Sequence, residues 1–134
     1  SSAASDVYKR QFFDSIEVAP GVHANGRMTL GENIADHGGL QVSYQAFKKA
    51  TAAAPLEVKD GFTPEQRFFL AYANVWANNT RPEAILQLTK IDVHSLGKWR
   101  VDAALPHIAA WYEAFGITEK DPMFVPVAER VSIW

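Results

Sequence analysis

The sequence predicts a mainly α-helical protein with little sheet. Two segments begin with the capping pattern of threonine followed three residues later by glutamate or glutamine, at Thr29 and at Thr63. Apolar residues recur at helical spacing after each threonine. The chain has 134 residues, of which 48% are hydrophobic, so it is long enough for one domain with one packed core.

Composition excludes several classes of function. A net charge of -2 and a pI near 6.0 give no electrostatic basis for nucleic-acid binding. The absence of cysteine excludes disulfides, thiolate metal sites and a cysteine nucleophile. The apolar runs are far shorter than the roughly 18 residues that a membrane helix needs, so no membrane segment is expected.

Residues 1–28 are predicted to form an N-terminal segment of mixed structure. A short alternation around Ile16–Val18 favours a strand, and Asn25-Gly26 is typical of a turn. The first residues contain no apolar h-region and are therefore not a signal peptide. We expect residue 1 to mark either the start of the segment chosen for expression or a cut made inside a longer chain.

The first predicted helix begins at Thr29, with Glu32 completing the capping box, and ends before a loop at 52–61. Its apolar positions have near-helical spacing. They are Ile34, Leu40, Tyr44 and Phe47.

The second predicted helix begins at Thr63, with Pro64 in its first turn and Gln66 completing a capping box. Its broad apolar surface predicts that it is buried. Shorter elements then follow. They are a helix at 81–89, a loop at 92–97, a helix at 100–115 that Pro106 kinks or divides and Gly116 ends, and an irregular tail.

Two carboxylates, Glu32 and Asp36, lie four residues apart on one face of the first helix. Like charges at this spacing repel by a few tenths of a kcal/mol. Spacing alone favours a simple explanation, because acids near a helix N-terminus are stabilised by the macrodipole. The pair Gly38-Gly39 weakens that explanation, because glycine inside a helix is costly and suggests the close approach of another group.

These residues belong to the segment GENIADHGGL, which resembles part of the zinc metallopeptidases of the neprilysin and endothelin-converting-enzyme family. The resemblance runs from about Gly26 to Trp134. Three further stretches match that family in the same order. They are FFLAYANVWANNTRPE at 68–83, DVHSLGKWR at 92–100 and the terminal tryptophan. The resemblance implies that 29–134 is the helical C-terminal part of a thermolysin-like (zincin) catalytic domain.

The resemblance also implies a zinc site. Glu32 matches the third protein ligand of the catalytic zinc, beside two histidines of an HExxH helix. A carboxylate with two neutral imidazoles leaves the fourth position of the metal open for water. Asp36 matches the acid that accepts a hydrogen bond from a zinc-bound histidine and orients its ring.

Five further residues acquire roles from the resemblance. His94 matches the histidine that stabilises the transition state, and Asp92 the acid that holds its ring, although spacing alone favours a surface Asp-His pair. Arg100 matches an arginine that binds a substrate carbonyl, for which a salt bridge is the alternative. Val75 and Trp76 match residues that line a substrate side-chain pocket, for which helix core is the alternative.

The family's catalytic apparatus is incomplete in this sequence. None of the four histidines is followed by glutamate with a second histidine at the fourth position, so two zinc ligands and the general base are absent. We therefore expect a C-terminal part of a longer zinc endopeptidase or oligopeptidase that is inactive and binds zinc poorly alone. Its expected partners are peptide substrates and the missing N-terminal part of the same polypeptide.

Two questions stay open at this point. Animal members carry a cysteine three residues before the last tryptophan, where this chain has Val131, which favours a bacterial source. The compartment is not determined by the sequence. The alternative function is a free-standing, non-catalytic helical module that binds peptides or a partner protein.

Overall fold

The structure is a computed structural model that describes residues 2–132, and it confirms a mainly α-helical fold with little sheet. The terminal Trp134, expected to pack as a structural aromatic, lies outside these residues. The elements follow in chain order: α1 (Ser2–Asp14), β1 (Glu17–Ala19), β2 (Val22–His23), α2 (Gly26–Thr51), α3 (Pro64–Val75), α4 (Pro82–Ile91), α5 (Gly97–Asp102), the 3-10 turn η1 (Leu105–His107), α6 (Ala109–Phe115) and the 3-10 turn η2 (Val127–Glu129).

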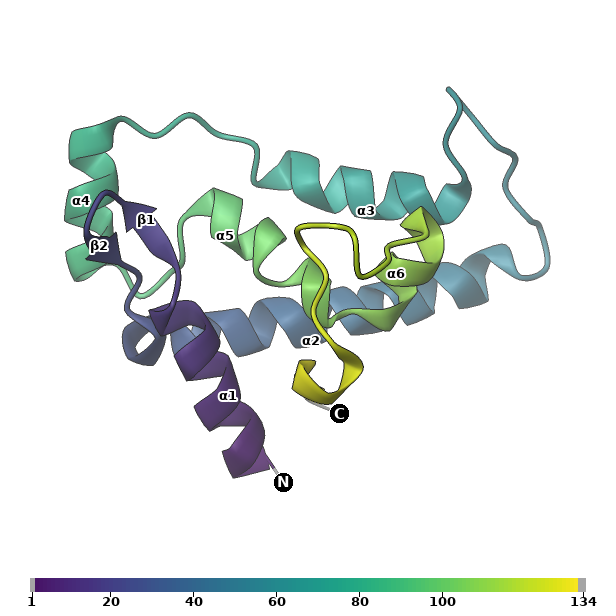
Figure 1. Cartoon of the computed structure of the whole chain (residues 1–134). Coiled ribbons are helices and arrows are strands. Elements are labelled where there is room, and N and C mark those ends of the chain that lie inside the picture. The colour runs from purple at the N-terminus through teal and green to yellow at the C-terminus, as the bar shows by residue number, and fades with distance from the viewer. Residues whose placement is uncertain (1, 133–134) are drawn as a thin grey trace.

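Helix α2 is the platform of the fold. It has 26 residues and runs along the base of the molecule, with α3, α5 and α6 above it and α1 packed near its start (Figure 1). The antiparallel hairpin β1–β2 lies beside α4 at one end. No helix among residues 2–132 combines the length and the apolar character required to cross a membrane.

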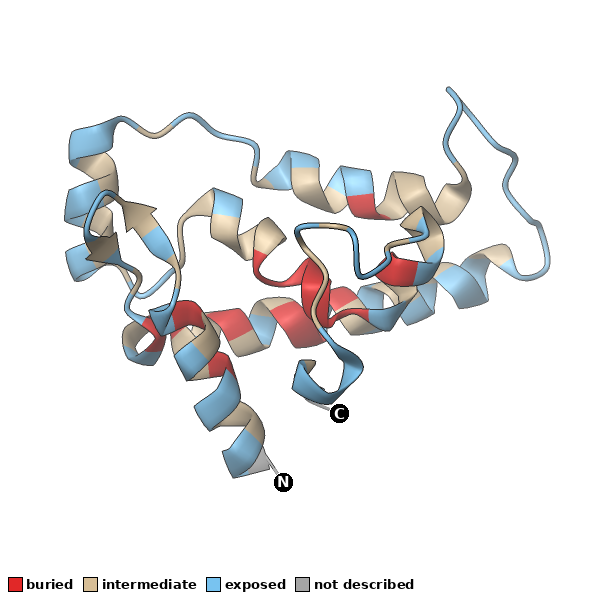
Figure 2. Ribbon diagram, in the orientation of Figure 1, coloured by how far each residue is buried: buried red, intermediate tan, exposed pale blue. Residues whose placement is uncertain are grey.

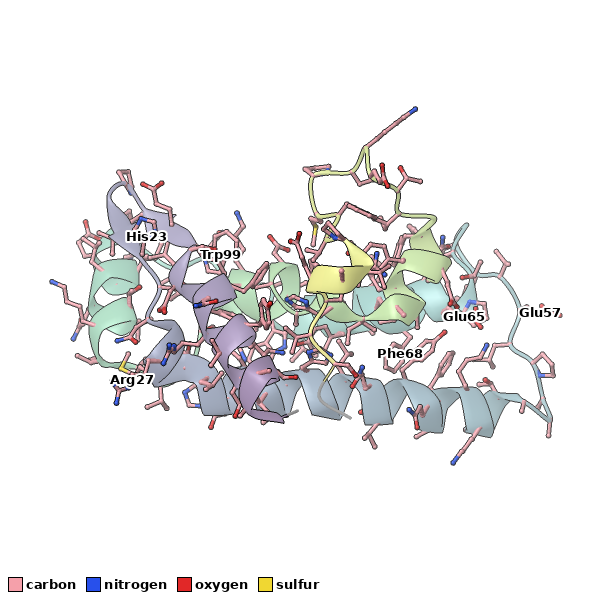
Figure 3. The ribbon with its side chains drawn as sticks, turned by 60° about the horizontal axis from the view of Figure 1, so that its bottom comes forward. His23, Arg27, Glu57, Glu65, Phe68 and Trp99 are labelled. Carbon is pink, nitrogen blue, oxygen red and sulfur yellow. The ribbon has the colours of Figure 1, made fainter. Side chains whose placement is uncertain are left out.

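The main core lies where α2, α3 and α6 meet. The buried residues are concentrated along α2 and in the turn between α5 and α6, whereas the connecting loops are exposed (Figure 2). Phe68 of α3 lies between α2 and α6 (Figure 3), with its ring 5.2 Å from that of Tyr44. The core residues are Leu40, Phe69, Leu105, Ile108, Trp111 and Tyr112.

A second buried cluster joins α1 to α2 and η1, and it is basic. Lys9 is 1% exposed, and its Nζ lies 2.6 Å from Nδ1 of His37, which is fully buried. The ring of His37 stacks on that of His107, with 6.1 Å between centroids. Burial lowers the pKa of Lys9 to about 7, that of His37 to about 3 and that of His107 to about 4. The two histidines are therefore neutral in the folded chain.

The N-terminal part of the chain differs from the prediction in two respects. Residues 2–14 form a helix that the sequence did not indicate, because one of its buried positions is Lys9 rather than an apolar residue. Helix α2 also begins at Gly26 and not at Thr29, so the predicted capping box there is wrong. The side chain of Asn25 caps the helix by accepting from the amide of Met28 at 3.0 Å.

Gly26 has a steric role at this helix start. A Cβ atom at that position would collide with the carbonyl oxygen of Arg10, so only glycine allows α1 to pack this closely against α2. The Asp14 carboxylate accepts from the Gly26 amide at 2.7 Å. The dipeptide Asn25-Gly26, predicted to form a turn, is therefore the place where the end of α1 packs against the start of α2.

The later elements agree more closely with the prediction. The capping box of α3 is present, with Gln66 N donating to Thr63 Oγ1 at 3.2 Å and Thr63 N donating to Gln66 Oε1 at 2.9 Å. The expected helix at 100–115 is divided into α5, η1 and α6 around Pro106, and it ends at Gly116 with φ of 62°. Helix α3 is less buried than predicted, since only Phe69 is fully buried.

We expect acid to destabilise the fold through the two buried histidines. Below the ordinary histidine pKa of 6.5, both histidines become protonated in the unfolded chain. In the folded chain they stay unprotonated down to about pH 4 for His107 and about pH 3 for His37. Because the unfolded state then binds more protons, the free energy of unfolding falls as pH falls through this window, by up to about 1.4 kcal/mol per pH unit for each histidine.

Urea unfolding of the chain between pH 7 and 4 would measure this slope. His37→Gln should reduce this slope by the equivalent of about one bound proton. His23→Gln, at an exposed position of the hairpin, should leave the slope unchanged. An unchanged slope in His37→Gln would contradict the assignment.

Candidate active site

The two carboxylates singled out in the sequence lie one turn apart on α2 and face different partners. The Glu32 side chain is 43% exposed, and its Oε2 lies 3.4 Å from Nε2 of His94. The Asp36 side chain is only 14% exposed and is held by Arg100. The helical spacing therefore leaves one acid open to solvent and the other enclosed.

Asp36 and Arg100 form a two-pronged ion pair between α2 and α5. Arg100 Nε donates to Oδ2 at 2.6 Å and Nη2 donates to Oδ1 at 2.6 Å. This hydrogen bonding raises the pKa of Arg100 further above its ordinary value. The guanidinium carries five N–H donors, and two of them are used here, so the remaining donors are available to a ligand.

Residues from α3 complete the surroundings of Arg100. The guanidinium carbon lies 3.7 Å from the ring centroid of Trp76, the residue that follows the helix. Tyr72 donates from its hydroxyl to the backbone carbonyl of Arg100 at 2.8 Å. Arg100 is therefore fixed by charge from α2, and by stacking and a backbone hydrogen bond from the α3 side.

His94 stands on the loop between α4 and α5, with Asp92 as its partner. Asp92 Oδ1 accepts from the backbone amide of His94 at 2.9 Å and lies 2.8 Å from its Nδ1. These two hydrogen bonds, the backbone one first, lower the pKa of Asp92 and keep the carboxylate ionised. An ionised acceptor at Nδ1 requires a proton on that nitrogen, which leaves Nε2 facing Glu32.

A cavity of about 320 Å³ opens beside these residues. Its walls come from the end of α3, the 78–80 loop, α4, the loop that carries His94 and α5. It is lined by Trp76, Asn78, Thr80, Leu88, Asp92, His94, Ser95, Leu96, Gly97 and Arg100. The space is polar on the His94 side and aromatic on the Trp76 side, and it is large enough for amino-acid side chains.

Val75 lies apart from this cavity. Its side chain is 71% exposed and lines a separate hollow between α2 and α3, which Asp36 and Tyr72 also border. The structure thus brings together Glu32, Asp36, Asp92, His94, Arg100 and Trp76, and leaves Val75 on a neighbouring surface.

The glycine pair of α2 does not behave as predicted. Gly38 is buried, but a Cβ at Gly39 would meet no atom within 4 Å in the described part of the chain. The close approach expected there is therefore wrong for Gly39 within this chain. The tight contact of the site occurs instead at Gly97, where a Cβ would lie 2.7 Å from both the Trp76 carbonyl oxygen and Asn78 Nδ2.

Within residues 2–132, no three side chains of histidine, aspartate or glutamate are grouped so that they could hold a metal ion. His37, although adjacent to Asp36 in sequence, is buried against Lys9 and does not join the site. Sequence reasoning missed Tyr72 and Ser95 as supporting residues. Neither carries a pattern of its own, since each acts through a contact with a distant segment.

Comparison with known proteins identifies the family. The model of peptidase family M13 matches residues 4–131. The chain therefore belongs to peptidase family M13. This M13 chain is 39% identical over 123 residues to human membrane metallo-endopeptidase-like 1, covering 90% of the chain and 16% of that relative. It is 41% identical over 104 residues to human neprilysin, covering 75% and 14%.

Solved structures agree with this assignment. The M13 chain superimposes on the Mycobacterium tuberculosis zinc metalloprotease Zmp1, solved in complex with an inhibitor, with a TM-score of 0.93 and 29% identity over 99% of the chain and 21% of that protein. PepO of Lactobacillus rhamnosis gives a TM-score of 0.79 and 31% identity, over 98% and 19%. The chain thus spans about a fifth of the length of these structures.

Gly97→Ala should destabilise the M13 chain by about 1–3 kcal/mol, because an added methyl in a packed contact forces backbone shifts. Gly39→Ala is the matched control: alanine replaces an exposed helical glycine with open space around it and should stabilise by up to about 1 kcal/mol. Urea unfolding measures both. Equal effects of the two substitutions would contradict the steric argument.

Proposed function

We propose that this chain is the C-terminal part of a zinc-dependent endopeptidase or oligopeptidase that hydrolyses peptide bonds. One observation carries the proposal: Glu32 Oε2 and His94 Nε2 lie 3.4 Å apart, and His94 also lines the cavity that Arg100 and Trp76 border. A carboxylate ligand and a proton donor at the same place are the parts that metal-assisted peptide hydrolysis requires. The membership of family M13 supports it.

Glu32 is suited to be one of the three protein ligands of a catalytic zinc site. Glu32 is a half-exposed carboxylate whose ion-pair partner among the described residues is His94 and not an arginine or lysine, so its oxygens are accessible to a metal ion. Zinc catalytic sites use three protein ligands, and the other two would be imidazoles from a preceding segment of the polypeptide. When bound, the metal supplies an activated water and polarises the peptide carbonyl.

Asp36 would orient one of these imidazoles. A carboxylate has about four lone-pair sites, and Arg100 occupies two of them, one on each oxygen. The remaining sites can accept the second ring N–H of a zinc-bound histidine, which fixes its orientation. Arg100 in turn holds Asp36 in place for this role.

His94 would stabilise the charge that develops on the substrate. Asp92 holds the proton on Nδ1 and turns Nε2 toward the space next to Glu32. With Nε2 also protonated, the ring donates a hydrogen bond to the oxyanion that forms as water attacks the peptide carbonyl.

Arg100, Trp76 and Val75 would bind the peptide. The N–H groups of Arg100 that Asp36 leaves free are suited to a substrate backbone carbonyl. Trp76 forms one wall of the cavity for a substrate side chain. Val75, on the adjoining hollow, would line that pocket only with walls supplied by other parts of the polypeptide.

The proposal requires a longer polypeptide. Residues 29–134 would end the catalytic domain, with residues 1–28 as the segment leading into it, and the chain alone is expected to be inactive. The absence of cysteine and the presence of Val131 support a bacterial source. An HExxH motif encoded upstream would support the peptidase, and a gene without it would favour the non-catalytic helical module.

In the full-length protein, Glu32→Ala should abolish both zinc binding and peptidase activity, because it removes one of three protein ligands. Metal analysis and hydrolysis of a fluorogenic peptide measure the two effects. Glu57→Ala, on the exposed 52–61 loop, is the matched control and should change neither. Full zinc occupancy in Glu32→Ala would contradict the ligand assignment.

His94→Ala should keep the metal and lower turnover by about 10²-fold or more, as expected for the loss of an oriented donor to an oxyanion. His23→Ala removes an exposed histidine of the hairpin and serves as the control. Loss of zinc in His94→Ala would mean that this residue is a ligand and that its proposed role is wrong.

A further inference from the structure

We propose that Asn33 is a positioning residue that holds His94 in place through Ser95. The inference rests on the proposed peptidase function. Asn33 follows Glu32 on α2, and Ser95 follows His94 on its loop. The Ser95 hydroxyl donates to Asn33 Oδ1 at 2.8 Å, across 62 residues of sequence. This hydrogen bond joins the helix of the candidate ligand to the loop of the candidate proton donor.

The hydrogen bonds behind Asn33 have one possible direction. The Thr29 hydroxyl donates to the backbone carbonyl of Asn25 at 3.0 Å, and a carbonyl can only accept. Thr29 Oγ1 must therefore accept from Asn33 Nδ2, which lies 3.0 Å away. The amide oxygen of Asn33 is left facing Ser95. Since the Asn33 side chain is buried, this orientation is fixed.

Apart from the contact between Glu32 and His94, the loop is separated from the start of α2 by a small space. A cavity of about 20 Å³ lies behind it, between Asn25 and Thr29 on one side and Asp92, His94 and Ser95 on the other. That volume is enough for one water molecule, so the loop is not in close contact with Asn25 and Thr29 at this place. His94 itself is half-exposed, and its partners are Asp92 of the same loop and Glu32 of α2. Because the proposed zinc would engage Glu32, the link from Ser95 to Asn33 is the contact that would hold this loop on α2 in the zinc-loaded protein.

The geometry makes a specific chemical demand at both ends of the link. Asn33 presents an acceptor, so position 95 needs a hydroxyl donor, which serine and threonine supply and alanine does not. Position 33 provides a donor toward Thr29 and an acceptor toward Ser95. An ionised aspartate supplies only acceptors, so it would still accept from Ser95 once the Thr29 hydroxyl rotates toward it, whereas alanine at position 33 removes the acceptor.

The test uses the zinc-loaded full-length protein and a fluorogenic peptide. Ser95→Ala should lower kcat about tenfold, equivalent to about 1.4 kcal/mol, with KM and zinc content unchanged. Ser95→Thr should restore kcat, and Asn33→Ala, which removes the acceptor, should lower it as Ser95→Ala does. Ser15→Ala is the matched control, because it removes an exposed hydroxyl directly after α1 that donates to the Phe12 carbonyl at 2.7 Å. This substitution should leave kcat unchanged.

A double variant separates positioning from general stability. In a His94→Ala background, Ser95→Ala should cause no further loss of kcat, because the residue through which it acts is already gone. Equal losses in both backgrounds, loss of zinc, or an unchanged kcat in Ser95→Ala would each overturn the inference. A wild-type protein that binds zinc but cleaves no peptide would instead refute the proposed function.

Discussion

The ion pair between Asp36 and Arg100 determines how the site is assembled. These residues are 64 positions apart in sequence, and their two short hydrogen bonds fix α5 on α2 in both distance and rotation. Because Arg100 also stacks on Trp76, the end of α3 is brought to the same point. Three helices thus meet at one guanidinium, and the loop that carries His94 is attached directly to the first residue of α5.

Helix α2 serves two purposes through its periodicity. Asn33, His37 and Leu40 follow one another at three- and four-residue intervals and face the buried side. Glu32 and Asp36, each one residue earlier, lie on the adjoining side and face His94 and Arg100. The rigidity that the core gives to the helix is therefore passed to the carboxylates, which suits a site that needs fixed geometry.

Local signals predicted local structure well in the second half of the chain, although the same capping pattern at Thr29 did not mark a helix start. The Thr63–Gln66 capping box and the helix end at Gly116 were predicted because their hydrogen bonds lie within a few residues of one another. The carboxylate spacing on α2 also followed from helical periodicity. By contrast, α1 was missed, because Lys9 occupies one of its buried positions and the helix is held by a contact with Gly26. Partners separated by many residues, such as Tyr72 and Arg100, leave no local pattern.

The contact at Gly26 makes α1 part of the folded unit. Lys9 reaches His37 only because the two helices cross without a side chain between them. Trimming the chain to begin at Gly26 would expose His37 and its neighbour His107 to water, and the stacked imidazoles would no longer be shielded by Phe12, whose ring lies 4.8 Å from that of His107. A truncation designed around the catalytic motifs alone would therefore remove the residues of α1 that cover the buried histidines of α2 and η1.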